Sequence, residues 1–291
     1  MYIKKKNIKK QTNKNKVFRK GVSGFFKHLM FILLILVTLF PIYFIFVTAF
    51  KSRTEFMTNK ISIPQTFVFE NFIIAFRDKI FLIWTVNTII LTFGTIIISV
   101  LFSIFAAYAI AKINFPGRKK LLNFIIFLML VSPIVIIVPL FVLFTEIKLI
   151  NSYFGLILIY SGLVIPFSIY LLTSFFRSVS SSLIEAAQID GCSMFGIIFK
   201  IIVPISTAPI ITLVIVNSLY VWSEFIFALV FLQANKMRTL MVGISVFQSR
   251  FNINVPVIMA GMMLATIPMI ILYIAGQKFF IRGIVGGALK E

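Results

Sequence analysis

Six long stretches of this sequence contain almost no charged side chain. Five of them carry no Asp, Glu, Lys or Arg, and the sixth is interrupted only by Glu224. A helix that crosses the hydrocarbon core of a bilayer needs about 20 consecutive apolar residues, and each stretch is long enough. The sequence therefore predicts an all-α, polytopic membrane protein with six transmembrane helices. The predicted spans are approximately 27–49, 82–111, 121–145, 154–176, 205–232 and 257–280.

Composition excludes the other broad classes. Hydrophobic residues make up 60% of the chain and charged residues 12%, whereas a soluble domain typically carries about 25% charged residues. A chain this apolar is neither an ordinary soluble protein nor a disordered one.

The distribution of positive charge predicts the orientation in the membrane. Of the 28 Lys and Arg residues, 19 lie in segments on the N-terminal side of the membrane and nine in segments on the other side. Cytoplasmic loops carry the excess of Lys and Arg, so we expect both termini in the cytoplasm. Residues 1–24 form a lysine-rich leader before a membrane domain over 25–291. We interpret the leader as an anchor on anionic lipid and not as a nucleic-acid module, because no folded domain accompanies it.

The residues needed for most catalytic or metal chemistry are missing. Cys192 is the only cysteine and His28 the only histidine, so neither an intrachain disulfide nor a His-based metal site is expected. No phosphate-binding G-x-x-x-x-G-K-[ST] loop, H-E-x-x-H or G-x-S-x-G motif occurs. The chain is therefore predicted to be no enzyme and to hold no cofactor or metal.

The segment between the fourth and fifth predicted spans is the most informative. Ser182 and Glu185 have the spacing of a capping box, and Gly191 stands where a left-handed residue would end a helix. The spacing predicts a short cytoplasmic helix over 183–190. A helix is not needed to join two spans, because two to eight residues usually do so.

This short helix has features of a docking surface. Ala186 and Ala187 form a small face beside the carboxylates of Glu185 and Asp190. A small face lets another protein approach closely. The alternative is that Glu185 only caps the helix and that Asp190 is only a surface charge.

The residues from Glu185-Ala186-Ala187 through Gly191 to Val203-Pro204 resemble the EAA loop of the membrane subunits of ABC importers. Other segments resemble the carbohydrate-uptake branch of that family, in particular the second of its two permease subunits, and the resemblance extends over about 25–291. These segments are Asn87-Thr88, Ala106–Ala109, Phe115–Arg118, Trp222–Phe225, Arg238–Leu240 and Phe280–Ala288.

The resemblance implies the fold of a type I ABC importer permease and four kinds of partner. These are a second permease subunit, two ATPase subunits, an extracytoplasmic solute-binding protein and a sugar or oligosaccharide substrate. It implies that Glu185, Ala186, Ala187, Asp190 and Gly191 couple the permease to an ATPase subunit, and that the tail 284–291 contacts the ATPase pair. The alternative within this family is an importer of another small solute, such as polyamine or glycerol phosphate.

Glu224 is the one acidic residue inside a predicted span, and such residues usually have a function. Asn217, Tyr220 and Glu224 have the spacing of one helix face, which could line a path for a hydroxylated substrate. The alternative is a structural hydrogen bond to another span.

Two other classes of function fit less well. A membrane enzyme would need catalytic acids or histidine within the spans, where only Glu224 is available. A channel or receptor working alone would have no reason to display a capped cytoplasmic helix.

Overall fold

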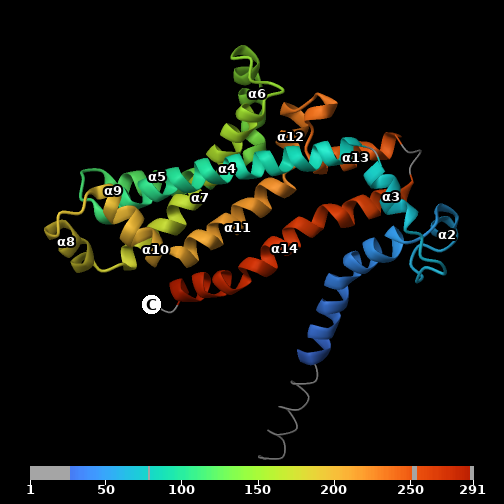
Figure 1. The fold of residues 1–291 in the computed structure, drawn as a ribbon, viewed down its shortest axis with the longest axis horizontal. Coiled ribbons are helices and arrows are strands. Elements are labelled where there is room, and N and C mark those ends of the chain that lie inside the picture. The colour runs from blue at the N-terminus through green and yellow to red at the C-terminus, as the bar shows by residue number, and fades with distance from the viewer. Residues whose placement is uncertain (1–26, 78, 251–253, 289–291) are drawn as a thin grey trace, which may run out of the picture.

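The computed structural model describes residues 27–77, 79–250 and 254–288, so the leader 1–24 lies outside the described residues. Every regular element in these ranges is helical (Figure 1). The first helix, Lys27–Ala49, precedes α2. The further α-helices are α2 (Arg53–Thr58), α3 (Glu70–Arg77), α4 (Lys79–Lys112), α5 (Arg118–Leu128), α6 (Ile137–Glu146), α7 (Tyr153–Ser178), α8 (Ser181–Ile189), α9 (Met194–Ile197), α10 (Val203–Ile205), α11 (Thr207–Ser223), α12 (Ile226–Phe231), α13 (Leu240–Arg250) and α14 (Val255–Ala288).

Four of the predicted spans are single long helices. They are Lys27–Ala49, Lys79–Lys112, Tyr153–Ser178 and Val255–Phe279. Two further pairs of helices, each bent at a short break, are together apolar and long enough to cross a membrane. The count of six spans holds when each bent pair crosses once.

The third predicted span, 121–145, is not one straight helix. α5 ends at Leu128, a 3-10 turn begins at Pro133, and the two halves meet at 88°. Proline has no N–H to donate to the preceding turn, and it restricts the residue before it to extended backbone. Ser132 is extended as this restriction requires, with ψ 124°, so the break in the span is explained by Pro133.

The fifth predicted span, 205–232, is also divided. α11 ends at Ser223, Glu224 is extended with ψ 132°, and α12 begins two residues later. Before α11, the helical residues Met194–Ile205 meet it at 80°. The prediction of a single helix over 205–232 was therefore wrong, and the candidate for the fifth span is the bent pair Met194–Ile205 and Thr207–Ser223.

The centre of the bundle is the pair α4 and α7, which run parallel, with Asn87 beside Tyr153 at their beginnings and Lys112 beside Val179 at their ends. α11 packs against this pair, and α14 covers α11 (Figure 1). The face of α4 that is buried in this core is rich in small hydroxylated residues. Such residues let helix backbones approach closely inside a membrane. The buried members are Thr88, Thr92, Thr95, Ser99 and Ser103.

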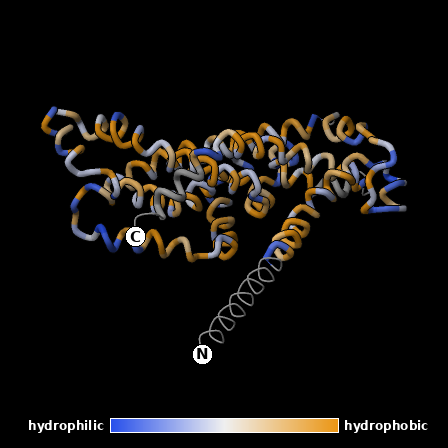
Figure 2. The backbone as a smooth tube through the Cα atoms, turned by 90° about the horizontal axis from the view of Figure 1, so that it is seen from below, coloured by the Kyte–Doolittle hydropathy of each residue, from blue (hydrophilic) through white to orange (hydrophobic). Residues whose placement is uncertain are grey.

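Several loops and short helices lie at opposite ends of the bundle, while α6 and α12 project from its side between the ends (Figure 1). Figure 1 shows α8, α9 and the turn between α4 and α5 at one end, and α2, α3 and α13 at the other. Figure 2 shows apolar residues along the helices and polar residues gathered towards the ends. This agrees with the alternation of loops on which the charge count rests.

Candidate coupling site

The short helix predicted over 183–190 is present as α8, but it begins differently. α8 starts at Ser181, its N-cap is Ser180, and no side chain caps it. The Ser180 and Ser182 hydroxyls lie 2.6 Å apart and hydrogen-bond to each other. The predicted capping box was wrong, because Ser182 lies inside the first turn and not at the N-cap.

The C-terminal end of α8 matches the prediction. Gly191 has φ +77°, the left-handed conformation. Its N–H donates to Gln188 O at 3.0 Å, and the Cys192 N–H donates to Ala187 O at 2.9 Å. This pair of bonds is a Schellman motif, which satisfies the last carbonyls of a helix and favours glycine at this position.

The inner face of α8 packs on the bundle. Ile184 is 6% exposed and Ala187 is 7% exposed, and both belong to an apolar cluster with Tyr108 of α4 and Phe176 of α7. Ala187 is therefore not part of an exposed small face, as the sequence had suggested. Positions three apart share one side of a helix, so Ile184 and Ala187 seat α8 together, and the small side chain serves the chain's own core.

The outer face of α8 is open. Glu185, Ala186, Asp190 and Gly191 are exposed there, and Ile189 is 87% exposed. Sequence reasoning missed Ile189, although it stands four residues after Glu185 and so shares its face. The exposed surface of α8 thus combines an apolar side chain with two carboxylates and a small residue.

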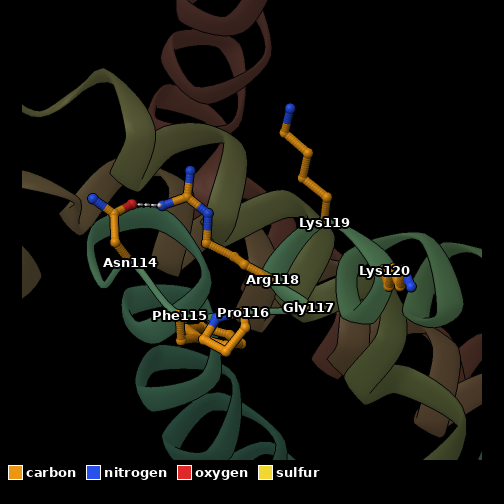
Figure 3. A pocket seen from close by; sticks show the side chains of 7 residues that line it. All are labelled: Asn114, Phe115, Pro116, Gly117, Arg118, Lys119 and Lys120. Atoms are coloured by element: carbon orange, nitrogen blue, oxygen red, sulfur yellow. Dashed lines mark hydrogen bonds between the residues drawn. The ribbon is translucent and has the colours of Figure 1, made fainter.

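The connections of α8 to the spanning helices run through α4 and α7. α7 ends at Ser178, just before α8 begins, and the Lys112 ammonium at the end of α4 donates to Val179 O between them. The neighbouring turn from α4 to α5 forms an open hollow of about 560 Å³ lined by residues 114–120. Figure 3 shows Arg118 in this hollow, where it donates to Asn114 Oδ1 at 3.0 Å.

The polar residues predicted on one face of the fifth span do not form a stripe. Asn217 is buried and donates to Ser168 Oγ of α7 at 3.0 Å, whereas Tyr220 is 38% exposed. Glu224 lies beyond the end of α11. Its carboxylate therefore does not continue the helix face of the other two.

Glu224 connects two helices. Its carboxylate accepts the Tyr160 hydroxyl at 2.6 Å and the backbone N–H groups of Phe227 at 2.9 Å and Ala228 at 3.1 Å. The first turn of a helix leaves N–H groups without intrahelical partners, and a carboxylate there is favourable. Glu224 thus caps α12 and ties it to α7, as the alternative of a structural hydrogen bond predicted.

The bond from Tyr160 can be tested by removing one oxygen atom. Tyr160→Phe should lower the free energy of unfolding by about 1–3 kcal/mol, because the partly buried carboxylate of Glu224 loses a donor. The substrate concentration for half-maximal uptake should stay unchanged. Thermal unfolding of the purified protein and uptake assays measure the two effects, and an unchanged melting temperature would contradict the assignment.

Residues 99–286 match the family model described as the binding-protein-dependent transport system inner membrane component. The matched region is more than half of the chain and contains α8. The chain belongs to this family. The resemblance of the EAA segment is thereby confirmed, and the chain is a membrane permease subunit of an ABC transport system.

Two relatives and one solved structure match this permease over most of its length. The probable ABC transporter permease protein YurM of Bacillus subtilis is 34% identical, over 95% of this chain and 92% of its own. The sulfoquinovosyl glycerol transport system permease protein SmoH of Agrobacterium fabrum is also 34% identical, over 93% and 97%. The crystal structure of a bacterial ABC transporter involved in the import of the acidic polysaccharide alginate contains a chain with a TM-score of 0.80 at 24% identity, over 89% and 96%. This likeness confirms the predicted importer-permease fold.

Proposed function

We propose that this permease imports a sugar or oligosaccharide by alternating access, driven by separate ATPase subunits that dock on the outer face of α8. Relatives named for transport of a sulfoquinovosyl glycerol and for import of alginate support the substrate class. The observation that supports the coupling role is that α8 is buried on one face and exposed on the other. One face is fixed in the bundle and the other presents an 87% exposed isoleucine.

The packing of α8 would transmit a displacement of this helix to the spanning helices. Ile184 and Ala187 are buried with residues of α4 and α7, and the chain before α8 is tied to the end of α4 through Lys112. A push on Glu185, Ala186 or Ile189 would therefore move α8 together with both helices. Rigid-body motion of packed elements is a common way to carry such a signal.

We propose that the second permease subunit contacts the first helix of this chain. Lys27–Ala49 is only 6% buried within this chain over its most apolar window, and it stands away from the bundle in Figure 1. An apolar helix with so little of its surface buried must be surrounded by lipid or by another helix. At the other end of the chain, α14 continues to Ala288, and we propose that the tail 284–291 contacts the ATPase pair.

The one acid inside the spans disfavours a polyamine as substrate. Glu224 is the only acid in the predicted spans, and its two oxygens accept three hydrogen bonds from the chain itself. A polyamine would need carboxylates free to pair with its ammonium groups. A sugar does not need them.

An uptake assay tests this substrate class. The permease and the transport genes beside it would be expressed in a host that lacks sugar importers, and uptake of radiolabelled sugars and oligosaccharides would be compared with uptake of spermidine and glycerol 3-phosphate. We expect uptake of at least one saccharide, dependent on the binding protein. Uptake of spermidine or glycerol 3-phosphate alone would reject a sugar substrate.

Cys192 reports the orientation of α8. Its side chain is exposed, one residue after the glycine that ends the helix. A membrane-impermeant maleimide should label it in inverted vesicles and not in intact cells, because we place α8 in the cytoplasm. Mass spectrometry of the tryptic fragment measures the labelling, and modification in intact cells would reject the proposed orientation.

A further inference from the structure

The segment 224–240, here called the outer hairpin, links α11 to α13 and contains α12. Three side chains on the first turns of α4 bond to its backbone. Trp84 Nε1 donates to Asn235 O at 2.8 Å, and Thr88 Oγ1 accepts the Leu240 N–H at 2.9 Å. Asn87 Nδ2 lies between them and donates to Lys236 O at 2.8 Å and to Arg238 O at 2.9 Å.

Asn87 also joins α7 to this arrangement. Its side chain is 4% exposed, and its Oδ1 accepts the Tyr153 hydroxyl at 2.7 Å. Both of its N–H bonds and its oxygen are therefore used within the chain. A buried amide costs free energy unless it is hydrogen-bonded, so Asn87 is stable here only while its partners on the hairpin and on α7 stay in place.

The turn that precedes α7, together with α7 itself, holds the other half of the outer hairpin. The Asn151 N–H donates to Phe231 O at 2.9 Å, and Asn151 Oδ1 accepts the Ala234 N–H at 2.8 Å. Glu224, at the start of the hairpin, accepts the Tyr160 hydroxyl. The hairpin is thus bonded to α7 at its beginning, to the turn before α7 in its middle, and to α4 at its end.

We propose that Asn87 is a positioning residue for transport, which fastens the outer hairpin to α4 and α7 so that all three move as one gate body. The inference rests on the transport activity and not on the identity of the substrate. α4 and α7 are also the helices on which α8 is seated. A displacement of α8 would therefore also displace the hairpin, which lies at the opposite end of the same two helices.

The first test asks whether Asn87 fastens the hairpin. Ala228 of α12 is fully buried, so the variant Ala228→Cys in a Cys192→Ser background reports opening of the hairpin through its reaction with a maleimide. Asn87→Leu should raise this labelling rate about tenfold, because the carbonyls of Lys236 and Arg238 lose their donor and are stabilised when the hairpin opens to water. A cysteine at Ala107, fully buried near α8, is the matched control and should label at the wild-type rate. An unchanged rate at position 228 would overturn the proposal.

The second test asks whether the hairpin moves with α4. The full importer, with Asn87→Cys and Lys236→Cys in the permease, would be placed in proteoliposomes and joined by a short cross-linker that a reductant cleaves. Asn87→Cys alone should raise ATP hydrolysis without the binding protein and lower the solute imported per ATP about tenfold. Cross-linking should restore coupling, which a general loss of stability would not predict.

Two outcomes of the second test would overturn the proposal. The first is a cross-linked importer that hydrolyses ATP but imports only after reduction, since the hairpin would then have to move relative to α4. The second is uncoupling that the cross-link leaves unchanged. The wild-type importer in the same vesicles tests the proposed importer function separately, because dependence of ATP hydrolysis on the binding protein is measured without identifying the solute.

Discussion

Replacing Ile189 with aspartate should release the ATPase subunit while the permease stays folded in the membrane. Ile189 is 87% exposed in this chain, so its loss removes little of the chain's own packing. In a docked interface the buried side chain would contribute about 1.5–3 kcal/mol, and the affinity should fall about 10- to 150-fold. Co-purification of the ATPase with the tagged permease, followed by titration of the purified pair, measures this loss.

Ile63 provides the matched control for Ile189. It is 68% exposed and follows α2 at the opposite end of the bundle, so Ile63→Asp should leave ATPase binding unchanged. A permease with Ile189→Asp that retains its ATPase and full uptake would show that the outer face of α8 is not the docking surface.

Ala187→Leu tests a different property of α8. Because Ala187 is 7% exposed in the cluster between α8, α4 and α7, a leucine there overpacks the permease itself, at about 1–3 kcal/mol. We expect lower accumulation in the membrane. Loss of the ATPase in this variant would have two explanations, a direct clash at the interface or a displacement of α8 within the permease, and it would not distinguish them.

Much of the architecture follows from the sequence for simple physical reasons. A lipid environment requires long apolar segments, so the spans are visible as charge-free runs, and four of them are single helices. Pro133 and Gly191 act through their own backbone chemistry, and both do so here. These features depend on neighbouring residues in the chain, which the sequence displays directly.

The errors arise where distant residues decide the outcome. The buried side of α8 is set by clusters on α4 and α7, which no local pattern reveals, so Ala187 was assigned to the wrong face. Glu224 interrupts a helix because the Tyr160 hydroxyl and the first turn of α12 hold its carboxylate. Asn87 was noticed only for its resemblance to the family, because its partners lie about 150 residues further along the chain.

Gly243→Ala should be strongly disruptive, because among the glycines that the structure describes it has the shortest distance from an added Cβ to another atom. A Cβ atom at Gly243 would lie 2.0 Å from Cε3 and 2.2 Å from Cδ2 of the Trp84 indole. The indole cannot move aside easily, because it is 1% exposed and its Nε1 is bonded to Asn235 O. Either α13 separates from α4 or the indole gives up that bond. We expect the free energy of unfolding to fall by at least about 1–3 kcal/mol, measured by thermal unfolding of the purified permease.

Gly162→Ala is the control that isolates the contact with Trp84. Gly162 also lies within a helix, but a Cβ there meets nothing within 4 Å. Alanine favours a helix over glycine by about 1 kcal/mol, so Gly162→Ala should leave stability unchanged or raise it. Opposite signs for the same substitution would show that Trp84 holds α13 and the outer hairpin on α4. If Gly243→Ala were as stable as Gly162→Ala, α13 would not pack on the indole, and the anchor at the end of the hairpin would fail with it.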